Sequence, residues 1–239
     1  MRLIVFLLLI IFSENSFGQN YRFNVGLEAS PSRISLRGNE TLKQYNKATI
    51  GFSTGAFLEY CFPEILSIHA GFGLERKGAA AEKNVTDLNG NIIANVPSRS
   101  NFDYWIFPVL LKATFGKNLK YFFDAGSYFG YLIQQNDIYK LAGNPSTTVN
   151  VTNLDKRFDS GLTAGFGIAI PFKQKYACSI ELRDNLGFSN INGVQPYDSW
   201  TIRTNSANLL IGVSYKFIKR ITKSVDTTNL SAPVPALVK

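Results

Sequence analysis

The strongest constraint on this chain is a two-residue alternation of apolar and polar side chains, which recurs in segments of about ten residues. In residues 21–30 every odd position is apolar, and every even position is polar, charged or glycine. Successive side chains of a β-strand point to opposite faces, so each segment predicts a strand with one apolar and one polar face. The segments are residues 21–30, 49–60, 66–75, 104–115, 121–133, 159–170, 176–183 and 206–217.

The connections between these segments alternate in length. The short ones carry Pro, Gly or Lys and span residues 62–65, 116–120 and 171–175. The long, polar ones span residues 31–48, 78–101, 136–156 and 187–202. Short turns at one end and long loops at the other are typical of outer-membrane β-barrels, whose short turns are periplasmic. An even number of strands then places both chain ends in the periplasm. Pro108, inside the fourth segment, predicts a local irregularity.

The first residues indicate export. Arg2 precedes an apolar run over residues 3–12, and a small residue, Gly18, precedes Gln19. The run is shorter than the roughly 20 residues of a membrane-spanning helix, and the pattern is that of a cleaved signal peptide. No later run is long enough for such a helix, which leaves a soluble secreted protein or a transmembrane barrel. We expect a signal peptide over residues 1–18, a barrel over 19–217 and a flexible periplasmic tail over 218–239.

The direction of the apolar face separates these two classes. A soluble barrel would turn about five large apolar side chains per strand into an interior that, with eight strands, is only just wide enough for side chains. Its glycine-rich and serine-rich face would then meet water for no physical reason. With the apolar face toward lipid, small residues instead leave room for a few charges in a narrow lumen. The sequence therefore predicts an all-β, eight-stranded, antiparallel, up-and-down transmembrane β-barrel in a bacterial outer membrane.

The charges within the strands agree with this orientation, because all of them occupy polar-face positions. A Lys or Arg that faces lipid at mid-bilayer costs about 2–4 kcal/mol. Inside a barrel such charges must pair, since an unpaired buried ion is strongly destabilising. Lys216 also shares this face. We predict a structural lumenal network made of Arg22, Glu28, Glu59, His69, Glu75, Lys112, Asp124, Asp159, Glu181 and Arg183.

Aromatic residues gather at the expected periplasmic strand ends. They are Tyr21, Tyr60, Phe115, Tyr121, Phe172, Tyr176, Tyr215 and Phe217. This placement predicts an interfacial aromatic girdle, although strands are in general rich in aromatic residues.

Composition and charge exclude other classes. Two cysteines, Cys61 and Cys178, are too few for a disulfide scaffold, and we expect both to be unpaired. The net charge of +8 is spread along the chain, and export argues against a nucleic-acid partner. Electrostatic affinity for anionic lipid headgroups stays open as an alternative use of this charge.

Several short motifs resemble a known family. They are FPVLLK at residues 107–112, DAG at 124–126, DSG at 159–161, GFG at 165–167 and GVSYKF at 212–217. In order and spacing they are similar to the PorT-like outer-membrane β-barrel family common in Bacteroidetes. The resemblance implies an OmpA-like barrel without catalytic residues, and it raises an accessory role in protein secretion or gliding as an alternative. The tail beyond Phe217 departs from barrels that stop at a terminal aromatic residue.

The strongest catalytic alternative is a lipid-modifying enzyme with a histidine base beside a serine and a carboxylate. His69 is the single histidine, and its distance from the turn at residues 63–64 places it in the periplasmic half of the lumen, away from outer-leaflet lipid. We expect it to be an interior, hydrogen-bonded side chain. The chain also lacks the His/Cys clusters of a metal site. We expect no enzyme, no metal and no cofactor.

A pore and an interaction protein remain. An eight-stranded lumen is filled by side chains, so an open channel is not expected. Recognition often lies in loops on a rigid scaffold, and residues 84–95 and 139–151 are the candidate surfaces, although they could equally be plain solvated loops. The expected partners are outer-membrane lipid and a protein that contacts the extracellular loops. The sequence names no specific partner.

Overall fold

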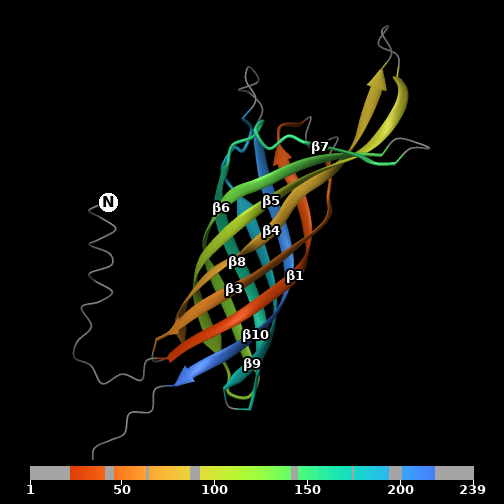
Figure 1. The fold of residues 1–239 in the computed structure, drawn as a ribbon. Coiled ribbons are helices and arrows are strands. Elements are labelled where there is room, and N and C mark those ends of the chain that lie inside the picture. The colour runs from red at the N-terminus through yellow and green to blue at the C-terminus, as the bar shows by residue number, and fades with distance from the viewer. Residues whose placement is uncertain are drawn as a thin grey trace, which may run out of the picture.

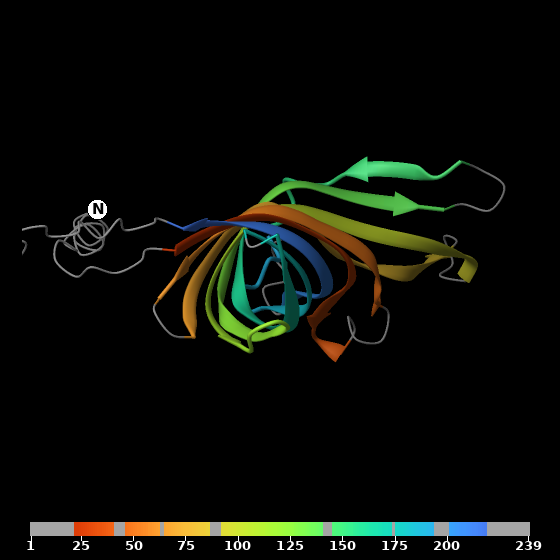
Figure 2. The same ribbon diagram turned by 90° about the horizontal axis from the view of Figure 1, so that it is seen from below.

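A computed structural model describes residues 22–40, 46–62, 65–86, 92–140, 145–173, 175–193 and 201–218. Eight antiparallel strands form a closed ring, because β1 pairs with β10 and β4 pairs with β5 (Figures 1 and 2). The ring confirms the predicted eight-stranded, up-and-down transmembrane barrel. Its strands are β1 (Arg22–Gly38), β3 (Thr49–Cys61), β4 (Leu66–Thr86), β5 (Ile92–Phe115), β6 (Lys120–Tyr139), β8 (Phe158–Phe172), β9 (Tyr176–Gly187) and β10 (Ile202–Ile218).

Two further strands lie outside the ring. β2 (Asn46–Lys47) pairs with β4, and β7 (Thr147–Asn150) pairs with β6. The start of β1 and the end of β10 lie at the same end of the barrel as the short turns between β5 and β6 and between β8 and β9 (Figure 1). Among the described residues there is no helix of the length and hydrophobicity needed to cross a bilayer.

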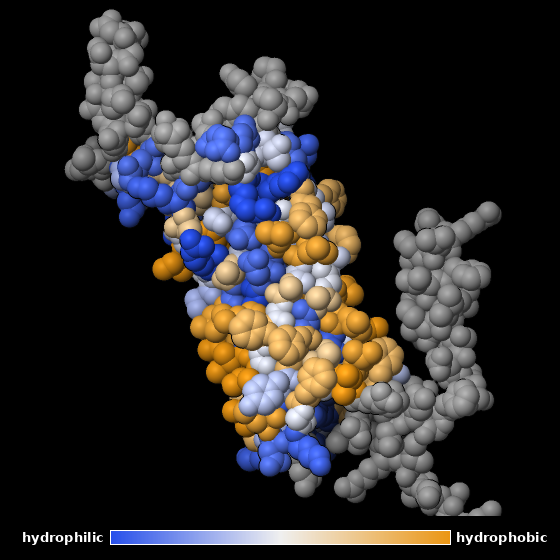
Figure 3. Space-filling model, turned by 180° about the vertical axis from the view of Figure 1, so that it is seen from behind, coloured by the Kyte–Doolittle hydropathy of each residue, from blue (hydrophilic) through white to orange (hydrophobic). Residues whose placement is uncertain are grey.

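The apolar side chains point away from the lumen, as predicted. Phe23 is 39% exposed, Phe166 55% and Ile211 59%. Figure 3 shows hydrophobic residues gathered over the middle and lower wall, with hydrophilic residues toward both ends. In β6 the adjacent residues Phe122 and Phe123 face opposite sides of the wall, and their side chains are 1% and 59% exposed. A residue's position in the alternation therefore decides whether it meets the lumen or the outer wall.

Aromatic rings form contacts around the short-turn end of the wall. Tyr176 lies 5.6 Å from Phe172 and 5.2 Å from Tyr215, measured between ring centroids, and Tyr215 lies 4.8 Å from Phe217. Phe23 lies 5.2 Å from Tyr60. Tyr21 is outside the described residues. The described rings therefore have the arrangement expected of an interfacial girdle.

The strands are longer than the alternation suggested. The predicted loops over residues 31–48, 78–101, 136–156 and 187–202 are partly strand. In particular, β4 and β5 stay paired as far as Thr86 and Ile92, so they form a hairpin beyond the ring. The prediction failed there because the sequence of these extensions, such as Gly78–Glu82, lacks the alternation of large apolar and polar residues.

Three local features disturb the strand pairing. Pro108 has no N–H to donate, and the β4–β5 pairing skips from Ala70 to Gly73 beside it, which confirms the predicted irregularity. A bulge in the β5–β6 pairing leaves both Ile133 and Gln134 exposed. Gly78 has φ +143°, and a Cβ there would collide with the Ser100 carbonyl oxygen. This glycine lets β4 bend where it leaves the ring.

Candidate functional site

The charged residues predicted for the lumen lie on the inner face of the ring. Glu75, Asp124, Asp159, Glu181 and Arg183 are each at most 6% exposed. The side chain of Arg22 lies outside the described residues. The inner charges are arranged in successive layers along the barrel axis rather than in one cluster.

The layer nearest the short turns centres on Glu59. Its carboxylate accepts hydrogen bonds from Ser67 (2.7 Å) and from the Lys112 ammonium (3.4 Å). Lys112 also lies 4.0 Å from the centroid of the Phe122 ring. This layer lines a vestibule of about 560 Å³, which Lys216 also borders.

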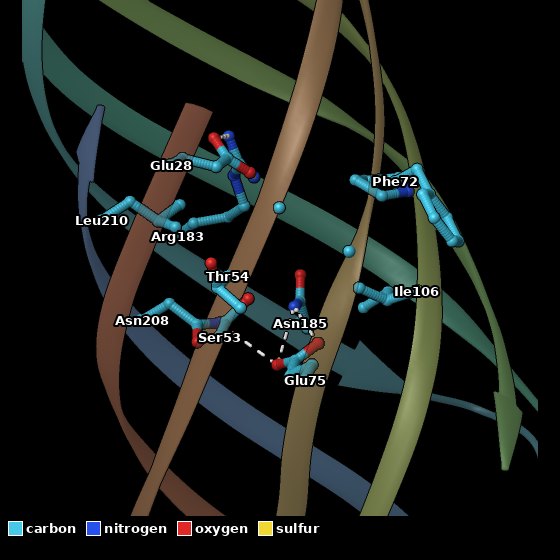
Figure 4. A pocket seen from close by; sticks show the side chains of 13 residues that line it. Glu28, Ser53, Thr54, Phe72, Glu75, Ile106, Arg183, Asn185, Asn208 and Leu210 are labelled. Carbon is cyan, nitrogen blue, oxygen red and sulfur yellow. Dashed lines mark hydrogen bonds and ion pairs between the residues drawn. The ribbon is translucent and has the colours of Figure 1, made fainter. Parts of the chain in front are cut away.

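The central layer is an ion cluster around Arg183. Its guanidinium contacts Glu181 (Nε to Oε1, 2.5 Å) and Glu28 (Nη1 to Oε1, 2.9 Å), so it bridges β9 and β1 past β10, the strand between them. Figure 4 shows Arg183 and Glu28 pointing toward one another. A bidentate geometry on two carboxylates suits the planar guanidinium. The result is a cross-link between strands that are not neighbours in the ring.

A second central layer holds Glu75 without a cation. Asn185 donates to both carboxylate oxygens (3.1 Å each), and Asn208 donates to Oε1 (Figure 4). Ser206 also donates to Oε1. These donors come from β9 and β10, on the far side of the lumen from β4. Hydrogen bonds to the charged form stabilise a buried carboxylate, so neutral amides replace a salt bridge here.

The layer nearest the hairpins contains a residue that the sequence prediction missed. Lys77 is 1% exposed, and its ammonium lies 3.0 Å from Asp159 Oδ2 and 3.8 Å from the centroid of the Tyr128 ring. Asp159 also accepts hydrogen bonds from Tyr128 (3.1 Å) and Thr204 (2.7 Å). The signal was present, since Lys77 follows Glu75 by two residues and so continues the inward positions of β4.

Above this layer an apolar plug fills the barrel. It consists of Phe102, Tyr104, Leu132 and Ile191, each at most 2% exposed, with Leu36 and Ile202 packed against it. Ile191 belongs to the segment that follows β9, and an isolated bridge between Asn192 and Asp155 holds this segment in place. Burial raises the pKa of the Asp155 carboxyl. Among the layers below, the cavity bordered by Glu28, Glu75 and Arg183 measures only about 20 Å³.

Two predicted residues are buried without hydrogen bonds in the described structure. Neither ring nitrogen of His69 nor either carboxylate oxygen of Asp124 has a partner. The expectation that His69 is hydrogen-bonded is therefore wrong. Its ring stacks on Phe57 at 4.7 Å between centroids, and Glu59, the residue opposite it in β3, is occupied by Ser67 and Lys112. Within the described residues no group of His, Cys, Asp and Glu could hold a metal ion, and both cysteines are free.

The far end of the barrel carries its longest extensions. The β4–β5 hairpin and the β6–β7 pair project beyond the ring (Figures 1 and 2). All four residues of β7 are exposed, and β7 pairs only with β6 among the described strands. Residues 84–95, one of the candidate surfaces, belong largely to β4 and β5, and their side chains lie outside the described part.

The family follows from a comparison of the sequence with family models. Residues 15–193 match the model described as "Outer membrane protein beta-barrel domain". The chain belongs to this family. It is thus an outer-membrane β-barrel protein, located in the bacterial outer membrane, with its short turns on the periplasmic side. A search of curated proteins found no match.

Solved barrels share the general architecture at low similarity. Ail, the attachment invasion locus protein of Yersinia pestis, is 12% identical with a TM-score of 0.42, covering 83% of this chain and 100% of that one. Neisserial surface protein A is 15% identical with a TM-score of 0.41, and the match covers 82% of this chain and 97% of that one. A major outer membrane protein from Thermus thermophilus is 11% identical with a TM-score of 0.45, and the match covers 82% of this chain and 99% of that one. Similarity at this level carries no inference about function.

The buried Lys77–Asp159 pair predicts that removing Lys77 alone destabilises the barrel much more than removing both charges together. Lys77→Met should destabilise the barrel by about 3–5 kcal/mol, because Asp159 is left charged and buried without its cation. Adding Asp159→Asn should restore most of the loss. Urea unfolding from lipid vesicles measures both variants. Lys47→Met is the control, since its ion pair with Glu82 is exposed on both sides. Equal effects of Lys77→Met and Lys47→Met would contradict a structural role for the buried pair.

Proposed function

We propose that the protein is a closed outer-membrane barrel that binds a partner protein through its extracellular hairpins. The observation that carries this proposal is the contrast between the two ends of the described structure. The lumen is crossed by paired side chains and capped by the apolar plug, whereas the β4–β5 and β6–β7 extensions stand free of the ring. A rigid scaffold with projecting strands is a common arrangement for recognition.

A closed lumen argues against a diffusion pore. A solute would have to pass the Arg183–Glu28 bridge, the Lys77–Asp159 pair and the plug in turn. The Lys77–Asp159 pair joins β4 to β8 through the interior, and the Arg183–Glu28 bridge joins β9 to β1 past the intervening β10, so opening a path requires breaking buried ion pairs. We propose that the lumenal charges are structural, and that they fix the ring instead of selecting a solute.

The same geometry argues against an enzyme. His69 stacks on Phe57 and has no hydrogen-bond partner among the described residues, so it lacks there the oriented nucleophile that a histidine base activates. Its layer lies toward the periplasmic half, beside the Arg183 cluster, while outer-leaflet lipid lies outside the wall. The lumen therefore offers a lipid substrate neither a base nor access.

The exposed edge of β7 supports a binding role. An unpaired strand edge can accept an extended peptide as an additional strand, with backbone hydrogen bonds that supply affinity. Thr147, Thr148 and Asn150 flank Val149, which is 43% exposed. An accessory role in secretion or gliding, implied by the PorT-like resemblance, is one form that such an interaction would take.

The chain ends complete the proposal. We propose that residues 1–18 are removed as a signal peptide during export, and that the residues after β10 form a periplasmic tail. Both segments lie outside the described residues, and β10 itself runs through Ile218. In this proposal the signal peptide directs export, and the barrel between the two segments inserts into the membrane and presents the hairpins.

Photo-crosslinking in intact cells tests the binding role. A photoreactive residue at Val149 or Glu82 should form discrete protein adducts, because both side chains are exposed on the extensions. The same residue at Phe166 is the matched control, since that side chain meets lipid. Adducts of equal pattern and yield at all three positions, or none at the hairpins, would contradict the proposal.

Planar-bilayer recordings test the closed lumen. The purified barrel should give no stable conductance, because its ion pairs and plug obstruct the interior. A variant with Tyr104→Ala, Leu132→Ala and Ile191→Ala removes most of the plug and should leak more than the native chain. A steady, reproducible conductance from the native protein, unchanged in the triple variant, would show that a permanent pore exists elsewhere in the lumen.

A further inference from the structure

A groove in the outer wall is not used by the proposed function. It measures about 500 Å³ and crosses β3, β1, β10 and β9, which are neighbours in the ring. Its outward-facing residues are Pro31, Arg33, Ile50, Leu182, Ala207 and Leu209. The β1–β10 pairing skips Ser30 and Pro31 at this place, as expected for a proline that cannot donate. Small Ala207 and Pro31 therefore form a depression between the larger Ile50, Leu182 and Leu209.

The groove ends at the level where headgroups begin. Along β1 the outward positions within residues 23–31 are apolar, which matches the about 9–11 residues that a tilted strand needs to cross a bilayer. The next outward residue is Arg33, opposite Ile50 on one side and Ala207 on the other. On β10 the outward series continues past Ala207 to Arg203. The apolar groove thus leads directly to arginines on its extracellular side.

Positive charge is in excess at this border within the described structure. Arg37 lies directly opposite Arg203 in the β1–β10 pairing, and like charges in that position destabilise a sheet. No described carboxylate forms an ion pair with Arg33, Arg37 or Arg203. Arg37 donates to the Gly187 carbonyl oxygen (2.8 Å), and its Nε has no partner. One carboxylate, Asp184, lies opposite Ala207 in the β9–β10 pairing and attracts Arg37, so three arginines face one carboxylate here.

The neighbouring part of the wall, on β4 beside β3, shows what a neutralised position looks like. Arg76 is the first charged outward residue of β4, and it makes two hydrogen bonds to Asp103 of β5, of 2.6 and 2.8 Å. Its guanidinium also lies 5.0 Å from the centroid of the Phe52 ring. The outward arginine on β4 is therefore paired, whereas Arg33 on β1 and Arg203 on β10 have no ion pair within the described residues. That difference coincides with the groove.

We propose that the groove binds one outer-leaflet lipid, with an acyl chain against Ile50, Leu182 and Leu209 and phosphate groups on Arg33, Arg37 and Arg203. Guanidinium groups bind phosphate oxygens through paired, charge-assisted hydrogen bonds. Arg37 lies four residues beyond Arg33, about 13 Å along the strand. This separation fits a headgroup that carries two phosphates, as lipid A does, better than one with a single phosphate.

Native mass spectrometry of the full mature chain tests the proposal, with bis-phosphorylated lipid A as the probe. The native protein should bind one lipid A, and the double variant Arg33→Gln, Arg203→Gln should bind it about thirtyfold more weakly. The control Lys140→Gln, Lys156→Gln removes the same charge from exposed positions away from the groove and should bind like the native chain. Ala207→Leu fills the groove without changing charge and should also weaken binding.

Four results would overturn the proposal. Competition by inorganic pyrophosphate with the same affinity as lipid A would reveal a free-anion site. Equal binding of lipid A and phosphatidylcholine would reveal a nonspecific apolar wall. Equal losses in both double variants would reveal a general charge effect. A dimer that the groove variants abolish, with lipid binding unchanged, would show that a second copy occupies the groove. If the double variant does not fold, Arg33→Gln and Ala207→Leu give the same test separately.

Discussion

The cost of placing an ion among acyl chains is the constraint on which this structure depends. At about 2–4 kcal/mol for a lipid-facing Lys or Arg at mid-bilayer, it separates the two faces of every membrane-spanning strand. Charges that cannot face lipid must enter a narrow lumen, where they in turn need partners. Arg183 with Glu28 and Glu181, Lys77 with Asp159, and Lys112 with Glu59 supply them. The outer wall and the inner network are thus two results of one restriction.

This restriction also shapes what the protein can do. Because the ion pairs lie inside the ring, they join its strands and occupy much of the interior above the vestibule, which supports the closed lumen that we propose. The surfaces that we propose for partners lie outside the lumen. They are the exposed strand edge of β7, which meets water, and the arginines beside the wall groove at the headgroup level. We therefore propose that this eight-stranded barrel acts through its outer surfaces.

The sequence predicted the wall better than the ends. Alternation assigned Phe23, Phe166 and Ile211 to the lipid face, and the same rule placed Glu75 and Arg183 inside, because lipid enforces the contrast between faces. Above the membrane that contrast disappears, so the extensions of β4 and β5 were taken for loops. Lys77 was missed because the predicted strand ended at residue 75, although Lys77 continues its inward positions. Pairing partners were also beyond reach, since Glu75 meets Asn185 from the far side of the ring. The stacking of His69 on Phe57 depends on cross-strand register, which one-dimensional patterns do not contain.

A single tryptophan at neighbouring positions of β6 tests the central claim most directly. In a background with Trp105→Phe and Trp200→Phe, either Phe123→Trp or Phe122→Trp supplies the fluorophore. In vesicles of lipids brominated on their acyl chains, the tryptophan at position 123 should be strongly quenched and the one at position 122 should keep its emission. Equal quenching at both positions, or stronger quenching at position 122, would contradict an apolar face directed into lipid.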